Sequence, residues 1–314
     1  MRLKLFIHVL SMMCVKIVCR GTSESVPVEI GDYPYMVSIY IDNYHFCGGS
    51  LIHHSHVLSA ASCFDDITFL KGRVKVLMGN VNIREHTSAF QIYRTVKLLI
   101  HYKHNGSREL DNICILRVKI GTLLKLPHQL RYNNCHNYVG FIKISQSRVW
   151  PAPGTNCITL DWGWDISTSA ETQIKHTLMA RNLSSISYTQ CNEIMEGSAI
   201  NYDNQLCAGI PDVEDEACEE ILAYKNAGGP LICNGELFGI ITSGFSCDRP
   251  VDYELFINVG HYAKWIQTLI NWNAETKPFQ AIVLYPMDID RSSFAPSSGP
   301  PCLLLIFIMQ LFGL

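Results

Sequence analysis

The sequence predicts an all-β protein with one helix near its C-terminal end. Short apolar stretches alternate with turn residues along the chain, as in residues 35–41, 74–78 and 237–241. Strands of this length, separated by turns, are typical of an antiparallel barrel or sandwich. Clear helical spacing of apolar side chains occurs only in residues 261–272, and we expect a helix there that caps the β-structure.

The composition indicates a globular protein. Of the 314 residues, 48% are hydrophobic and 17% are charged, so the chain can bury a large core in one large or two small domains. The formal net charge of −3 provides no basic surface of the kind that nucleic acid or anionic lipid binds. We therefore expect neither as a partner.

The cysteine and histidine patterns bear on metal binding. Thirteen cysteines indicate disulfides and an oxidising compartment, and no pair has the CxxC spacing of many zinc sites. His53, His54 and His56 lie close together, and strand alternation would place His54 and His56 on one face. The pattern supplies no further ligand, so we expect surface histidines, no metal site and no other cofactor.

The two ends of the chain favour the secretory route. Residues 1–20 have the charged start and short apolar middle of a signal peptide. Residues 273–301 lose periodicity and gain Pro and Ser, which is typical of a linker or stalk. Residues 302–314 form an apolar tail shorter than the roughly 20 residues that span a bilayer. The tail is either the removable part of a GPI signal or a sticky or proteolysed terminus. The predicted location is secreted or on the extracellular cell surface.

Three motifs carry a family resemblance. They are Cys-Gly-Gly-Ser-Leu-Ile at 47–52, Val-Leu-Ser-Ala-Ala-Ser-Cys at 57–63 and Gly-Gly-Pro-Leu-Ile-Cys at 228–233. Together they resemble the trypsin/chymotrypsin family of serine proteases, from about Gly31 to Trp272. The resemblance implies a trypsin-like domain over residues 21–272, with two antiparallel six-stranded β-barrels, a C-terminal helix and a cleft between the barrels.

The same resemblance implies a disulfide framework. It pairs Cys47 with Cys63, Cys157 with Cys233, Cys191 with Cys207, and Cys218 with Cys247. Cys114 lies in an apolar stretch and is expected to be a small buried hydrophobe. Cys135 is either inert, a free reactive thiol or part of an intermolecular bridge.

The resemblance also locates the positions that carry catalysis in the family, and here they are degenerate. Serine proteolysis needs a hydroxyl nucleophile, an imidazole base and an orienting carboxylate. The base position is Ser62 and the nucleophile position is Ala227. The carboxylate position is Asn112 in the ungapped alignment, which keeps the strand alternation, whereas a slip of one residue would place Asp111 there.

The neighbouring positions have changed as well. Asn226 replaces the aspartate that pairs with the new N-terminus on activation, and Lys225 replaces an oxyanion-hole glycine. Eight residues separate Cys218 from Ala227 where the family has three, so we expect the oxyanion donors to be displaced. The former specificity pocket contains Glu216, Ser243, Gly244 and Glu254, of which Glu254 is expected to fill the space. Glu216 is either a remnant of a pocket for basic residues or part of a solvated acidic loop.

These observations predict a pseudoprotease. We expect a non-catalytic extracellular scaffold, cofactor or decoy that binds a protein partner, such as a protease or a cell-surface protein, and contacts membranes only through a C-terminal lipid anchor. The alternative is a hydrolase with residual or displaced serine-protease-like activity. Asn105 and Asn182 begin glycosylation sequons.

Overall fold

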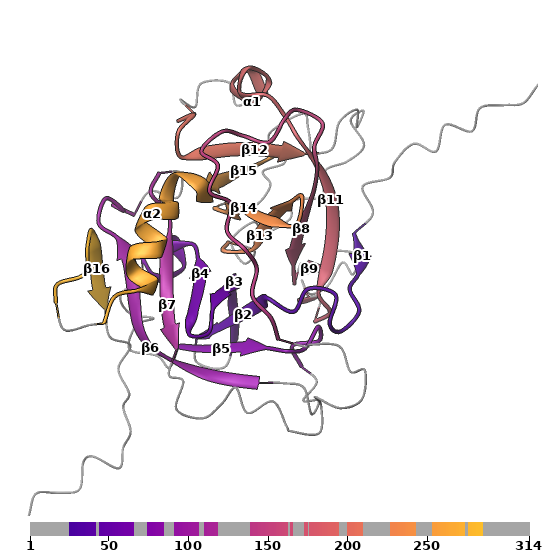
Figure 1. The fold of residues 1–314 in the computed structure, drawn as a ribbon. Coiled ribbons are helices and arrows are strands. Elements are labelled where there is room, and N and C mark those ends of the chain that lie inside the picture. Colours follow the sequence, from indigo (N-terminus) through magenta and orange to yellow (C-terminus); the bar gives the residue numbers. More distant parts are fainter. Residues whose placement is uncertain are drawn as a thin grey trace, which may run out of the picture.

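In the residues that the structure describes, the fold consists of two large β-sheets, each closed on itself, a two-stranded sheet, two α-helices and one 3₁₀ turn (Figure 1). The N-terminal part of the chain, indigo to magenta, builds most of one sheet, and the C-terminal part, pink to orange, builds most of the other. The computed structural model describes residues 25–41, 44–65, 74–84, 91–106, 110–118, 139–162, 164–165, 173–174, 176–194, 200–209, 227–242, 253–273 and 276–284. The predicted signal peptide and the apolar tail lie outside these residues.

The N-terminal barrel contains six strands in the order β6-β5-β2-β3-β4-β7, and pairing of β6 with β7 closes it. All its pairings are antiparallel. The strands are β2 (Met36–Ile41), β3 (Tyr44–His53), β4 (His56–Ser59), β5 (Val74–Met78), β6 (Gln91–His101) and β7 (Cys114–Val118).

The C-terminal barrel also contains six antiparallel strands, in the order β11-β12-β15-β14-β13-β8, and pairing of β11 with β8 closes it. The strands are β8 (Asn156–Asp161), β11 (Met179–Ser185), β12 (Gln205–Gly209), β13 (Pro230–Cys233), β14 (Glu236–Ile241) and β15 (Tyr253–Asn258). The short β1 (Val26–Pro27) pairs with β11, and β9 (Trp164–Asp165) pairs with β10 (Gln173–Ile174). The expected fold class of two six-stranded barrels is confirmed.

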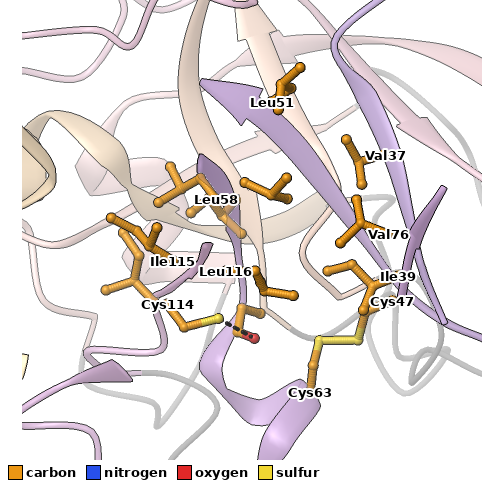
Figure 2. Close-up of a cluster of buried hydrophobic side chains, with 14 of the residues drawn as sticks. Val37, Ile39, Cys47, Leu51, Leu58, Cys63, Val76, Cys114, Ile115 and Leu116 are labelled. Carbon is orange, nitrogen blue, oxygen red and sulfur yellow. Dashed lines mark hydrogen bonds between the residues drawn. A yellow bond between two sulfur atoms is a disulfide. The ribbon is translucent and has the colours of Figure 1, made fainter. Parts of the chain in front are cut away.

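Aliphatic side chains from facing strands fill the N-terminal barrel (Figure 2). Val37, Ile39, Leu58 and Val76 have no exposed surface. Such residues come from strands far apart in the sequence, so their burial depends on barrel closure. Burial stabilises the fold by roughly 1.5–3 kcal/mol for each side chain of this size.

Helix α2 (Val259–Ile270) lies where the helical spacing predicts it. It begins two residues earlier than the periodic pattern because Asn258 caps it, with its Oδ1 accepting the N–H of Gly260 at 3.1 Å. Its apolar face, including Tyr262, Trp265 and Leu269, is buried.

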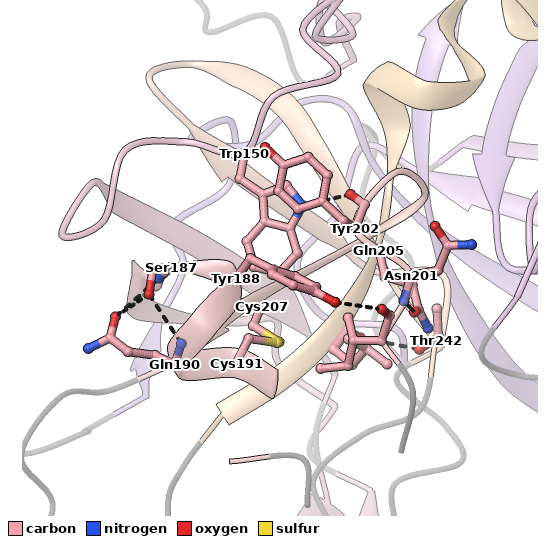
Figure 3. Close-up of a disulfide and its surroundings, with 12 residues drawn as sticks. Trp150, Ser187, Tyr188, Gln190, Cys191, Asn201, Tyr202, Gln205, Cys207 and Thr242 are labelled. Carbon is pink, nitrogen blue, oxygen red and sulfur yellow. Dashed lines mark hydrogen bonds between the residues drawn. A yellow bond between two sulfur atoms is a disulfide. The ribbon is translucent and has the colours of Figure 1, made fainter. Parts of the chain in front are cut away.

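Helix α1 (Tyr188–Ile194) was not predicted, although the sequence contains its capping signal. The backbone N–H of Gln190 donates to Ser187 Oγ at 3.2 Å, and Gln190 Oε1 accepts the N–H of Ser187 at 3.2 Å (Figure 3). This reciprocal arrangement is a capping box. With seven residues, the helix is too short for a clear periodic pattern.

Three of the four expected disulfides are present in the described residues: Cys47–Cys63, Cys157–Cys233 and Cys191–Cys207. The last joins α1 to β12 (Figure 3). Cys218, Cys247 and Cys135 lie outside the described residues. Cys114 is a free, buried cysteine in β7, as expected.

The described part of the expected linker of residues 273–301 contains a strand, and residues 285–301 lie outside the described residues. Ala281–Leu284 form strand β16, which pairs antiparallel with Leu98–His101 of β6. Trp265 Nε1 donates to Gln280 O at 2.9 Å and Trp272 Nε1 donates to Thr276 O at 2.9 Å. Residues 276–284, which we call the C-terminal strap, therefore lie against the N-terminal barrel and α2. Loss of helical periodicity after Trp272 indicated a linker, but four apolar residues suffice to extend an existing sheet.

Candidate functional site

The residues expected at the degenerate catalytic positions, Ser62, Asn112 and Ala227, lie near the contact between the two barrels. Gly48 N of β3 donates to Ala227 O at 2.9 Å, which joins the N-terminal barrel to the segment before β13. Gly228 follows with a φ of 87°, and a Cβ on it would overlap Ser59 Oγ and Gly48 O. Only glycine fits this left-handed position against the facing strand.

Ser62 and Asn112 face each other and form two hydrogen bonds. The Ser62 backbone N–H donates to Asn112 Oδ1 at 2.7 Å, and Asn112 Nδ2 donates to Ser62 Oγ at 3.0 Å. Ser62 lies in the 3₁₀ turn η1 (Ala61–Phe64), and Asn112 lies two residues before the start of β7 and has no exposed surface. The structure therefore brings these two expected positions together.

Asp111 points elsewhere. Its φ of 51° places it in the left-handed region, which turns its side chain away from that of Asn112. Its carboxylate accepts the Tyr262 hydroxyl at 2.9 Å and lies 3.2 Å from His101 Nδ1. Asn112, and not Asp111, therefore lies opposite Ser62.

Ala227, the residue expected at the nucleophile position, is buried. Ala227 is 6% exposed, and its carbonyl bonds to Gly48. The expected activation and oxyanion positions Asn226 and Lys225 lie outside the described residues. So do Glu216, Ser243 and Gly244 of the former specificity pocket.

Glu254 is the one member of that pocket set that is described. It lies in β15, is 4% exposed, and its carboxylate is 3.6 Å from the guanidinium of Arg181. The same guanidinium is 3.6 Å from Asp161. This cluster was not predicted from the sequence, because Asp161, Arg181 and Glu254 come from three different strands, β8, β11 and β15. The positive charge of this guanidinium, which lies near both carboxylates, offsets the desolvation cost of burying the Glu254 carboxylate.

Cys114 provides no substitute nucleophile. Its thiol donates to Ala60 O at 3.3 Å inside the N-terminal barrel (Figure 2). Burial, reinforced by the negative charge of Asp65, raises the pKa of the Cys114 thiol well above its usual value. Since the thiolate is the reactive form, this side chain is inert near neutral pH.

The histidine group does not follow strand alternation, because β3 ends at His53 and the chain turns before His56 begins β4. His53 pairs with His56 across the hairpin, and their ring centroids are 5.4 Å apart. His54 is exposed and packs against Phe141. In the part of the chain that the structure describes, no three His, Cys, Asp or Glu side chains are grouped as metal ligands.

The two sequon asparagines are exposed, Asn105 after β6 and Asn182 in β11. Among the described helices, none is both long and apolar enough to cross a membrane.

The three residues expected at the family's catalytic positions contribute a hydroxyl, an amide and a methyl group, whereas acyl transfer requires a base, a carboxylate and a nucleophile. An amide neither accepts nor releases a proton near neutral pH. The hydrogen bonds between Ser62 and Asn112 hold the loop and strand together but cannot activate the hydroxyl.

Comparison with known proteins places the chain in one family. Residues 23–266 match the family model described as Trypsin. Trypsin-3 of Salmo salar is 31% identical over 255 residues, which cover 81% of this chain and 91% of the relative. Trypsin of Xenopus laevis and anionic trypsin of Canis lupus familiaris are each 30% identical, over 76% and 78% of this chain and 86% and 88% of their own lengths. The matched region and the identity to these trypsins, together with the two closed barrels, lead to one conclusion: this chain belongs to the trypsin-like serine protease family.

Proposed function

We propose that this chain is a catalytically inactive trypsin-family protein that acts as an extracellular protein-binding scaffold, as a cofactor or decoy. The observation that supports this most strongly is the pairing of Ser62 with Asn112 at 2.7 and 3.0 Å. A seryl hydroxyl and a carboxamide occupy the positions from which an imidazole and a carboxylate would act.

The chemical argument is a matter of proton transfer. A serine or threonine hydroxyl attacks a carbonyl only when a base takes its proton. Ala227 has no hydroxyl, and Ser62 contacts an amide that cannot act as that base. The free thiol of the described residues, Cys114, is buried and protonated. No described group of the site therefore combines a nucleophile with a base.

The scaffold, by contrast, is intact. Both barrels close, three disulfides hold loops and helix α1, and the tight contact of Gly228 with Gly48 is retained. A rigid framework of this kind can present surface loops to a partner without any catalysis. The three disulfides also fit the oxidising extracellular compartment that the proposal requires.

An active-site probe tests the loss of catalysis. The secreted protein, purified from a host that forms disulfides, is incubated with a fluorophosphonate reporter beside active anionic trypsin. We expect labelling of the trypsin alone. Labelling of this chain that disappears in Ser62→Ala would overturn the proposal, because it would identify an activated hydroxyl at that position.

Partner binding is tested by affinity capture from the extracellular surface, with wild type and Ser62→Ala as matched baits. We expect the same intact partner, a protease or a cell-surface protein, with both baits. If the partner is recovered as cleaved fragments from the wild-type bait and intact from Ser62→Ala, the alternative function, a hydrolase with residual activity, would be favoured.

The lipid anchor is part of the same proposal. If residues 302–314 are a removable GPI signal, a phosphatidylinositol-specific phospholipase releases the protein from the cell surface. A surface pool that resists the enzyme would show that the anchor prediction is wrong and leave the scaffold proposal unaffected.

A further inference from the structure

A pocket of about 300 Å³ has Asp111 in its lining, whereas the neighbouring Asn112 contacts Ser62. Its lining comes from the end of β6, the Asp111 turn, the segment before Trp150, helix α2 and the C-terminal strap. The strap lies beyond residue 266, where the family match ends, so one wall of the pocket is built from chain outside the matched domain. The volume is at the lower end of that of small-molecule sites.

The pocket has an excess of positive charge. Lys103, Arg148 and Lys264 line it, and all three side chains are exposed. None of them forms an ion pair with a carboxylate in the described part of the chain. Asp111 is the one acidic residue of the lining, and Asp203 lies near enough to His261 to influence it. The lining thus has three cationic side chains against one carboxylate.

The Asp111 carboxylate is already engaged. It accepts the Tyr262 hydroxyl at 2.9 Å and lies beside His101. Its negative charge also raises the pKa of Tyr262, although burial is the larger cause. An anionic ligand in the pocket can therefore contact the three cations, while the Asp111 carboxylate is held by Tyr262 and His101.

Two lining histidines have polar atoms that lack hydrogen bonds. Nδ1 of His261 is buried, and no described group donates to it or accepts from it. Nδ1 of His101 is 3.2 Å from Asp111 but is not in hydrogen-bond geometry. Burial lowers the pKa of both histidines, that of His101 to about 4, and the positive charge of Arg148 lowers that of His261 further. Neutral imidazoles can each donate one hydrogen bond to an oxyanion.

Aromatic side chains flank the cations. Tyr102 and Phe279 are 43% and 49% exposed, while Trp265 behind them is buried. Exposed aromatic rings beside cations without a carboxylate partner offer an apolar surface for a ring and positive charge for an anionic group. Phe279 belongs to the strap, so its part of this aromatic surface depends on docking of the strap.

We propose that this pocket binds a small organic anion, namely a sulfate or phosphate group carried on a single ring. The oxyanion would be held by Lys103, Arg148 and Lys264, and the ring would pack against Phe279 and Tyr102. The site is separate from the expected catalytic positions and goes beyond the proposed scaffold function. The pocket proposal and the scaffold proposal can therefore be disproved independently of each other.

Calorimetric titration with four probes tests the proposal on the full mature chain. Phenyl sulfate and phenyl phosphate carry both charge and ring, inorganic sulfate carries the charge alone, and methoxybenzene carries the ring alone. We expect one saturable site for a phenyl ester, at least tenfold weaker binding of inorganic sulfate and no binding of methoxybenzene. The preference between the two phenyl esters distinguishes a sulfated from a phosphorylated natural ligand.

Variants locate the site. Arg148→Gln with Lys264→Gln should weaken phenyl ester binding at least tenfold, because two of the three cations are removed. Lys143→Gln is the matched control, since Lys143 is exposed and pairs with Glu236 away from the pocket, and it should bind as wild type does. Phe279→Ala should weaken phenyl ester binding severalfold and leave that of inorganic sulfate unchanged. All four side chains are exposed, so the variants should fold.

A spectroscopic reading gives a second measure. A bound oxyanion should shift the ring resonances of His261 and raise its pKa. The proposal would be overturned if neither phenyl ester binds, or if the double variant binds the phenyl ester as tightly as wild type does. Binding of methoxybenzene as tight as that of the phenyl ester would also overturn it.

Discussion

At the scale of single residues, Asp111 and Asn112 show how one left-handed residue separates two chemical environments. Asn112 points to Ser62, while Asp111 points to Tyr262 and His101. The carboxylate nearest in sequence to the catalytic position is thereby bound to a different part of the fold. The strand alternation that favoured Asn112 could be read from the sequence, but the partners of Asp111 could not, because they come from distant segments.

Cys114 gives a first test at this scale. Its thiol is fully buried, and burial raises its pKa. We expect that iodoacetamide does not modify Cys114 in the native protein at pH 8 and modifies it completely in guanidinium chloride, as measured by peptide mass spectrometry. Rapid modification of Cys114 under native conditions would contradict the structure around β7.

His56 gives a test of pH dependence. Burial, with smaller contributions from His53 and Arg117, lowers the pKa of His56 from 6.5 to about 4. The unfolded chain therefore takes up a proton near pH 6.5 that the folded chain accepts only near pH 4. The stability contributed by His56 is fully present above pH 6.5 and is lost as the pH falls towards 4, by up to about 3 kcal/mol.

Urea unfolding at pH 7 and pH 4.5 measures this effect. His56→Gln should lose less stability between the two pH values than wild type does. His54→Gln, which changes the exposed neighbour, should lose as much as wild type, because the carboxylates and the other histidines are unchanged. An identical pH dependence for His56→Gln and wild type would show that burial does not hold His56 neutral.

At the scale of elements, the sequence predicted strands best where apolar runs are bounded by turns. Residues 74–78 coincide with β5, and 237–241 fall within β14. Helix α1 was missed because its evidence is a capping box and not a periodic face. Strand β16 was missed because it has only four residues, too few to show a clear alternation of apolar and polar side chains, and it only extends an existing sheet.

The turn before β13 gives a test at this scale. Gly228 has a φ of 87°, and an added Cβ would overlap backbone and side-chain atoms of β3 and β4. Gly228→Ala should reduce the free energy of unfolding by about 3–5 kcal/mol, which chemical denaturation or the secreted yield would reveal.

The matched control is Gly154→Ala. Gly154 has a similar φ of 81°, but no atom lies within 4 Å of its added Cβ. We expect a loss of only about 1–2 kcal/mol there, from backbone strain alone. Equal losses at the two glycines would mean that the barrels do not touch at Gly228.

At the scale of the whole molecule, the strap extends the protein beyond the matched family domain. It adds β16 to the N-terminal barrel and covers part of α2, through bonds from Trp265 and Trp272 to the strap backbone. The motifs predicted both barrels and the positions that meet between them. The ion cluster at Glu254 and the pocket beside α2 could not be predicted, because each depends on strands and segments paired only in the folded chain.

Truncation tests the strap. A chain that ends at Asn273 should melt about 5 °C or more below wild type, because the β16 pairing and both tryptophan hydrogen bonds are lost. A chain that ends at Leu284 retains them and should melt within about 2 °C of wild type. Calorimetry that finds the same melting temperature for both truncations would show that the strap does not dock.

The most direct test of the proposed loss of catalysis is hydrolysis of peptide esters with Lys, Arg, Phe or Leu at the cleaved position, with anionic trypsin as the positive control. We predict that the purified mature protein and its Ser62→Ala variant both hydrolyse these esters at the rate of buffer alone. A rate above that of buffer in wild type, absent from Ser62→Ala, would contradict the pseudoprotease assignment.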